Sequence, residues 1–201
     1  MNSILFNKIF QQAINDYHIS DNIDYQYVNP FVTSSLEYLL YKKCWIDTVQ
    51  WHLEDIIRAT AINPEMALKL KRRIDLSNQD RTDLVEQLDE YFFVKFEDIT
   101  VRSTAKLNTE TPAWSIDRLS ILNLKIFHMS EEANRTDATE AHKQKCSLKL
   151  NVLNQQFKDL SLAIDQLFED ILNGNRISKT YKQMKMYNDP ELNPILRNTT
   201  D

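Results

Sequence analysis

Apolar residues recur at intervals of three and four along most of this chain, and that spacing predicts helices. Near the N-terminus, Phe6, Ile9 and Phe10 fall on one face of a short amphipathic helix that should lean on the core. Four longer patterned segments follow. The expected helices span 3–17, 34–60, 64–96, 112–129 and 137–173.

Residues that typically begin or end helices stand at the limits of these segments. They are a capping box (Ser34, Glu37), two caps followed by proline (Asn63–Pro64, Thr111–Pro112), an acidic start (Asp137, Glu140) and a glycine stop (Gly174). Only two or three residues separate the second helix from the third, so these two should be antiparallel neighbours. The segment 97–111 lacks helical periodicity and predicts a long connection.

Composition supports the same class of fold. The chain of 201 residues contains one glycine and five prolines, too few turn formers for many hairpins. We therefore predict an all-α protein, an antiparallel bundle of four long helices plus a short N-terminal helix. Its length suits a single domain over 1–201, with a core at 34–174 and a C-terminal tail at 175–201 whose prolines forbid a continuous helix.

The second and fourth helices carry apolar residues on nearly every face, which predicts that both are buried. Ionisable residues nevertheless interrupt them, and the middle of the third helix, 75–83, is polar where a core stripe should run. Buried ionisable groups must be paired, hydrogen-bonded or shifted in pKa. We therefore take these residues as a candidate polar cluster: Asp47, His52, Asp55, Arg81, Asp117 and Arg118.

Each member of the cluster has a functional and a structural interpretation. His52 has Asp55 one helical turn away, which could hold its ring in one tautomer for acid–base work, or simply satisfy a structural histidine. Arg81 should lie level with Asp47 across the short turn, where it could pair with that carboxylate or grip an anionic ligand. The sequence leaves both interpretations open, and with them the question of whether the protein is an enzyme.

Several classes of function are excluded or disfavoured. A net charge of -5 provides no general attraction to nucleic acid. No apolar run reaches the roughly 18 residues of a membrane span, and the N-terminus lacks the pattern of a signal peptide, so we expect a cytoplasmic protein without membrane insertion. Cys44 and Cys146 stand in apolar helical contexts and predict core thiols.

We predict neither a metal nor a cofactor. A di-iron bundle needs Glu-x-x-His on two helices, and that tetrad does not occur in the sequence. Helical pyrophosphohydrolases hold Mg²⁺ with carboxylate pairs on separate helices, whereas Asp80 with Asp83 and Glu86 with Asp89 share one helix. Zinc fingerprints and phosphate-binding loops are also missing from the sequence.

Four stretches together resemble a bacterial family called domain of unknown function 4254. They read SSLEYLLYKKCWIDTVQWHLEDIIR, LKLKRRIDLSNQDRTDLVE, NTETPAWSIDRLSILNLKIFHM and YKQMKMYNDPELNP, within 29–194. The resemblance assigns no residue a role, but it implies a context in envelope-polysaccharide synthesis. We therefore expect an accessory or interaction protein with partners among envelope-biosynthesis proteins; the alternative is a small-molecule-binding protein or enzyme with a polar site between helices two, three and four.

Overall fold

Five helices of 18 residues or more make up most of the computed structural model, which describes residues 1–186 and 189–197. They are α1 (Ser3–Ser20), α2 (Leu36–Ile57), α3 (Pro64–Lys95), α4 (Pro112–Asn134) and α5 (Glu140–Leu172). The short helix α6 (Pro194–Arg197) and two strands, β1 (Lys106–Leu107) and β2 (Arg176–Ile177), complete the described elements. The predicted all-α bundle is confirmed.

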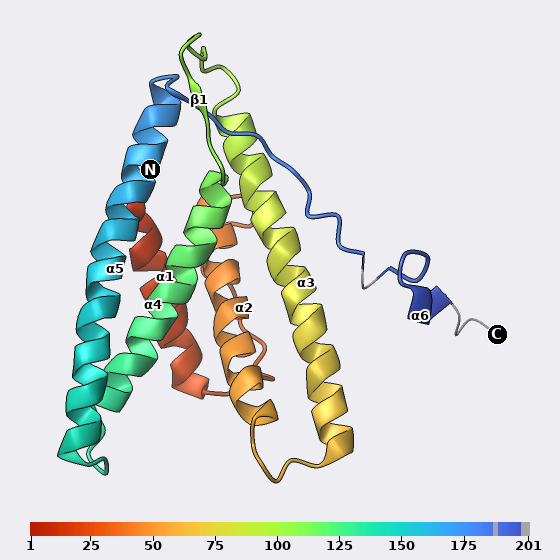
Figure 1. Cartoon of the computed structure of the whole chain (residues 1–201), viewed down its shortest axis with the longest axis vertical. Coiled ribbons are helices and arrows are strands. Elements are labelled where there is room, and N and C mark those ends of the chain that lie inside the picture. The colour runs from red at the N-terminus through yellow and green to blue at the C-terminus, as the bar shows by residue number, and fades with distance from the viewer. Residues whose placement is uncertain (187–188, 198–201) are drawn as a thin grey trace.

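Two antiparallel hairpins, α2–α3 and α4–α5, form the body of the bundle, and α1 packs against α2 and α4 (Figure 1). The first hairpin is antiparallel as predicted, but residues 58–63 separate its helices, more than the two or three expected, because α2 ends at Ile57. The expected caps of α3 and α4 are confirmed, because Asn63 accepts from the backbone N–H groups of Glu65 and Met66, and Thr111 accepts from that of Trp114. Both helices have proline at their first position.

Two of the predicted caps are wrong by one or two residues. The N-cap of α2 is Ser35, whose hydroxyl accepts from the backbone N–H of Tyr38, and not Ser34. The N-cap of α5 is Thr139, and not Asp137, which instead pairs with Arg135. In both places a residue one or two positions away also has a suitable side-chain oxygen, but the hydroxyl of the true cap accepts the backbone hydrogen bond.

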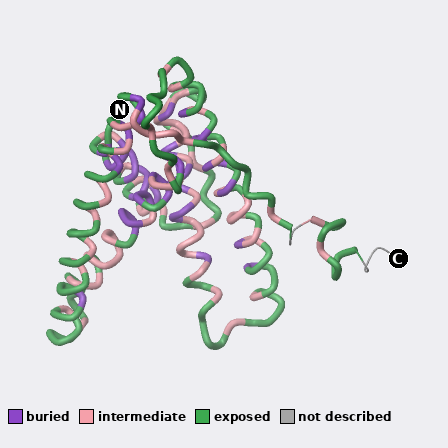
Figure 2. The backbone as a smooth tube through the Cα atoms, turned by 45° about the horizontal axis from the view of Figure 1, so that its top comes forward, coloured by how far each residue is buried: buried purple, intermediate pink, exposed green. Residues whose placement is uncertain are grey.

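The hydrophobic core gathers toward the end of the bundle that carries the strands, while the far ends of α3 and α5 are largely exposed (Figure 2). The N-terminal helix buries about as many residues as two of the longer helices: α1 buries eight of its 18 residues, α2 nine of 22 and α4 nine of 23. A second, smaller group, Leu53, Leu70 and Ile74, holds α2 against α3. So α1 belongs to the core itself.

The long connection 97–111 is anchored by a contact that the sequence pattern did not predict. Strands β1 and β2 pair in parallel, with Lys106 opposite Arg176 and Leu107 opposite Ile177. Gly174, the predicted stop signal, turns the chain into β2 with a φ of +69°. A Cβ atom there would lie 2.4 Å from the carbonyl oxygen of Thr100, so only glycine fits.

The C-terminal tail crosses α3 before it reaches α6 (Figure 1). Lys185 donates to the carbonyl oxygen of Asn78 at 3.2 Å and to the hydroxyl of Thr82 at 2.6 Å. The tail predicted over 175–201 includes 187–188 and 198–201, which lie outside the described residues. Cys44 and Cys146 are buried and free, as predicted. None of the helices in the described part of the chain is long and apolar enough to cross a membrane.

Candidate functional site

Four charged side chains meet between α2, α3 and α4, and we call Lys43, Asp47, Arg81 and Asp117 the charge network. Helix α2 places Lys43 one turn before Asp47, and the two form an ion pair in the core. The Lys43 ammonium also lies 2.9 Å from an oxygen of Asp117 on α4. The Lys43 side chain has no solvent exposure, and those of Asp47 and Asp117 are 3% and 4% exposed. Such buried charges persist only when they are paired.

Arg81 closes the network from α3. Its guanidinium donates two hydrogen bonds to Asp117, at 2.9 and 2.8 Å, and its Nε lies 3.5 Å from an oxygen of Asp47. Ser120 of α4 donates to the second oxygen of Asp47 at 2.6 Å. The predicted pairing of Arg81 with Asp47 is therefore present, but the bidentate partner of Arg81 is Asp117. With two cations and two anions, the network is formally neutral.

The two carboxylates of the network respond differently to the same burial. Burial raises the pKa of Asp47, and the attraction of Lys43 offsets only part of that rise. Burial acts in the same direction on Asp117, but Lys43 and the two hydrogen bonds from Arg81 outweigh it and hold its pKa below the usual range. Asp117 is thus the firmly ionised anchor of the two cations, and Asp47 is the carboxylate that holds a proton more readily.

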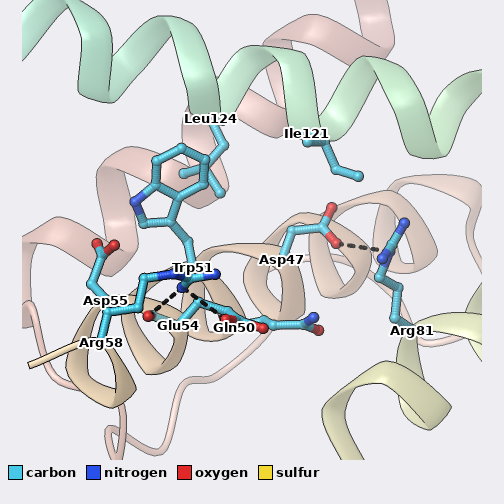
Figure 3. Close-up of a pocket in the computed structure, with 9 residues that line it drawn as sticks. All are labelled: Asp47, Gln50, Trp51, Glu54, Asp55, Arg58, Arg81, Ile121 and Leu124. Carbon is cyan, nitrogen blue, oxygen red and sulfur yellow. Dashed lines mark hydrogen bonds and ion pairs between the residues drawn. The ribbon is translucent and has the colours of Figure 1, made fainter. Parts of the chain in front are cut away.

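A pocket of about 370 Å³ opens beside the network, between α2, α3 and α4 (Figure 3). Asp47 and Arg81 lie at one end, and Ile121 and Leu124 of α4 form an apolar wall. The other lining residues come from the next turns of α2 and its C-cap: Gln50, Trp51, Glu54, Asp55 and Arg58. The side chain of Arg81 is 27% exposed, so the pocket connects the buried charges with solvent.

The six residues predicted as one cluster do not meet at one place. Asp47, Arg81 and Asp117 come together, and Asp55 lines the far end of the same pocket. His52 is five positions from Asp47, about 140° round the helix at about 100° per residue, and it points toward α1 instead. Arg118 is exposed and pairs with Glu110 at 3.1 Å. Neither His52 nor Arg118 is part of the charge network.

Sequence reasoning missed Lys43 and Ser120. A signal for Lys43 was present, because it stands one turn before Asp47 on a helix predicted to be buried, and oppositely charged side chains at that spacing contact each other. Ser120 gave no such signal, since a serine on a mixed helix is as common at the surface as inside.

A second polar group lies on the other side of α2, and we call His18, His52 and His128 the histidine cluster. These residues come from α1, α2 and α4, and one ring nitrogen of each lies within 4.8 Å of one ring nitrogen of the other two. Among the described residues, this is the group of side chains whose spacing could hold a metal ion. The sequence pattern predicted no metal and did not group these histidines, because they are 34 and 76 positions apart along the chain.

Comparison with known proteins places the chain in a family without assigning it an activity. Residues 37–180 match the family described as "Protein of unknown function (DUF4254)". The chain belongs to this family. The matched range contains the whole charge network and two of the three clustered histidines, while His18 lies before it. No curated protein and no solved structure matched the chain.

Proposed function

We propose that the protein binds a small hydroxylated molecule, such as a sugar, in the pocket between α2, α3 and α4. The observation that carries this proposal is that a tryptophan and a buried charge network share one solvent-connected pocket. Its volume of about 370 Å³ falls within the roughly 300–1,000 Å³ of typical small-molecule sites. Such sites combine apolar walls with a few fixed polar groups, as this one does.

The polar groups of the pocket are held in place by the protein. Gln50 is tied to α3, because its amide donates to Asn78 at 2.8 Å and accepts from the hydroxyl of Ser77 at 3.1 Å. Among the described residues, the oxygen of Asp47 nearest Arg81 makes only the 3.5 Å contact, so it has capacity to accept a hydrogen bond from a ligand hydroxyl. Fixed donors and acceptors of this kind favour a ligand with several hydroxyl groups.

Trp51 supplies a flat apolar surface for the ring of the ligand. Its indole stacks on His128, with ring centroids 4.8 Å apart and planes 13° apart, so its orientation is set before any ligand arrives. The charges at the pocket sum to about one negative charge, because the network and the Glu54–Arg58 pair are each neutral and Asp55 remains. This balance favours neutral or cationic ligands over anionic ones.

We further propose a cytoplasmic accessory role in bacterial envelope-polysaccharide synthesis, acting with other proteins of that process. This context rests on the family resemblance, and a sugar ligand is consistent with it. The alternative is an enzyme with its active site in the same pocket. Asp47 would then be the proton donor, because its pKa is raised.

Binding is tested by thermal shift and calorimetry on the metal-stripped protein. The ligand panel covers neutral hexoses, amino sugars, uronic acids and nucleotide sugars. We expect a neutral or amino sugar to raise the melting temperature, because a ligand bound only to the folded state stabilises it. Uronic acids should bind more weakly. If no member of the panel stabilises the protein, the sugar proposal is wrong.

Two pocket variants and one matched control locate the binding. Trp51→Leu and Asp55→Asn should weaken binding, since each removes a pocket contact. Asp98→Asn removes the same charge from an exposed residue outside the pocket and should leave binding unchanged. Equal binding by all three variants would place the ligand elsewhere.

A further inference from the structure

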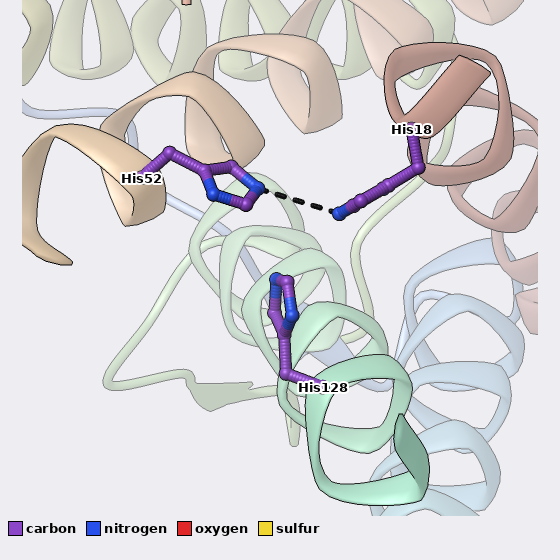
Figure 4. Close-up of side chains that lie close together, drawn as sticks. All are labelled: His18, His52 and His128. Atoms are coloured by element: carbon purple, nitrogen blue, oxygen red, sulfur yellow. Dashed lines mark hydrogen bonds between the residues drawn. The ribbon is translucent and has the colours of Figure 1, made fainter. Parts of the chain in front are cut away.

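Three imidazoles from three different helices face a common point in the histidine cluster (Figure 4). His18 lies in the last turn of α1, His52 near the end of α2 and His128 in the second half of α4. Their Nε2 atoms are directed toward the space between the rings (Figure 4). The His18 and His52 Nε2 atoms are 3.3 Å apart.

The hydrogen bonds at the opposite ring nitrogens determine two of the tautomers. His18 Nδ1 lies 2.7 Å from the carbonyl oxygen of Ile14, which can only accept, so Nδ1 carries the hydrogen. His128 Nδ1 lies 2.9 Å from the carboxylate of Glu131 and donates to it in the same way. In a neutral ring with Nδ1 protonated, Nε2 carries a lone pair. His18 and His128 therefore both direct a lone pair into the cluster.

His128 Nε2 is buried and has no hydrogen-bond partner in the described residues. A buried polar atom without a partner destabilises the folded state, and such atoms are rare in folded proteins. Phenylalanine or leucine would fill this place without that cost. The unpartnered nitrogen, aimed at two other imidazoles, is the observation that points to a missing ligand.

Aromatic rings surround the cluster and hold the imidazoles. Tyr17 stacks on His52 with centroids 5.0 Å apart, Trp51 stacks on His128 at 4.8 Å, and Phe127 lies 4.3 Å from His18. Burial in this shell lowers the pKa of His52, with His128 and His18 adding to the effect. Burial also lowers the pKa of His128, where His18 adds to the effect and Glu131 opposes it. Neutral rings are the form that ligates metal ions.

We propose that His18, His52 and His128 bind one divalent transition-metal ion, Zn²⁺ in the first place, through their three Nε2 atoms. An ion about 2.0–2.1 Å from each nitrogen keeps the nitrogens roughly 3.4 Å apart in a tetrahedral site. The His18–His52 pair already has this separation at 3.3 Å, and His128 closes the remaining distance by rotating about its side-chain bonds. His52, which donates to His18 without the ion, ligates in its other tautomer.

The surroundings of the three ligands match a metal site in two further respects. Metal-bound histidines usually donate their other ring N–H to a carbonyl or a carboxylate, and Ile14 and Glu131 accept in that way here. The carboxylate of Asp21, 65% exposed, places an oxygen 3.9 Å from His52 Nε2, near the proposed ion. Three imidazoles favour Zn²⁺, Co²⁺, Ni²⁺ or Cu²⁺ over Mg²⁺ and Ca²⁺.

The test uses the full-length protein without an affinity tag, stripped of metal with a chelator. Titration with Zn²⁺ in a calorimeter should show one equivalent bound, and Co²⁺ should give the visible absorption of a tetrahedral site. Mg²⁺ should not compete. Lack of stoichiometric Zn²⁺ binding would overturn the proposal.

Variants distinguish this site from other histidine contacts. His52→Gln and His128→Gln each remove a ligand and should weaken Zn²⁺ binding by more than the roughly 10–100-fold expected for an outer-shell change such as Glu131→Gln. The matched control is His142→Gln, because His142 is the fourth histidine of the chain and lies on α5 beside Cys146 and Glu132. If His142→Gln abolishes binding while His128→Gln retains it, the assigned site is wrong.

If the variants fail to fold, a measurement on the unmodified chain still tests the proposal. In ¹⁵N-resolved NMR spectra of the histidine rings, Zn²⁺ should shift the Nε2 signals of three histidines and leave that of His142 in place. Shifts confined to His142, or spread equally over all four rings, would overturn the assignment. This site adjoins the sugar pocket through Trp51, which lines the pocket and stacks on His128. Each proposal is tested with its own ligand, so failure of either leaves the other standing.

Discussion

The charge network and the histidine cluster lie on different faces of α2, and they differ in how far their polar atoms are satisfied. In the network, each charged group has at least one oppositely charged partner, and both oxygens of Asp117 accept hydrogen bonds from Arg81. In the cluster, a buried nitrogen of His128 has no partner among the described residues. The more deeply buried group is therefore the fully paired one, and the partly buried cluster keeps an unpaired nitrogen.

This difference separates a structural group from a group with capacity for a ligand. A closed network of ion pairs stabilises one arrangement of helices, and removal of one member leaves an uncompensated charge. The polar atoms of the histidine cluster stabilise the fold little, because one of them is unpaired, and a bound ion would stabilise it further. The network reaches a ligand only where Asp47 and Arg81 border the pocket.

The largest expected effect comes from Lys43→Met, which breaks the network at its centre. Two carboxylates would stay buried without their ammonium, and loss of one partner of a buried pair costs about 3 to 5 kcal/mol. The free energy of unfolding, measured by urea denaturation with circular dichroism, should fall by that amount. A loss under 1 kcal/mol would mean that the network is not closed as described.

Arg81→Met should have a smaller effect, about 2 kcal/mol, because hydrogen bonds to charged groups are each worth about 1.5–3 kcal/mol and Arg81 is partly exposed. Asp117 keeps Lys43 as a partner in this variant. The same denaturation measurement applies, with Lys43→Met as the reference. An effect equal to that of Lys43→Met would show that the two cations contribute alike.

His128→Phe should change the stability of the metal-free protein by less than about 1 kcal/mol, despite the burial of this residue. The variant removes an unpartnered nitrogen and a hydrogen bond to the exposed Glu131, which contributes little, while an aromatic ring remains to stack on Trp51. Thermal unfolding in the presence of a chelator measures the change. A loss comparable to that of Arg81→Met would show that the histidine cluster is itself a stabilising structure.

Arg118→Gln should have the smallest effect, below about 0.5 kcal/mol, because surface ion pairs contribute little. The side chain of Arg118 is 63% exposed and pairs with Glu110, which is also exposed. This variant serves as the surface control for the three changes above. A larger loss, or a loss of sugar binding, would return Arg118 to the candidate site from which the structure removes it.

The sequence by itself determined the helices and most of their limits. Periodicity predicted five helices that the structure contains, and the caps at Asn63 and Thr111 and the stop at Gly174 are where the residues indicated. These features depend on contacts within about four residues, so neighbouring side chains specify them. Where two adjacent residues could cap a helix, as at Ser34 and Ser35, the same information did not choose between them.

Only the tertiary structure decided which helix faces meet. Arg81 takes Asp117 of α4 as its bidentate partner, His52 joins two distant histidines and leaves the predicted cluster, and β1 pairs with a strand about 70 residues away. Each of these contacts depends on the rotation of one helix relative to another or on the path of a loop. Side chains from all the helices pack against one another and so fix these rotations and loop paths together. No local stretch of sequence contains that information.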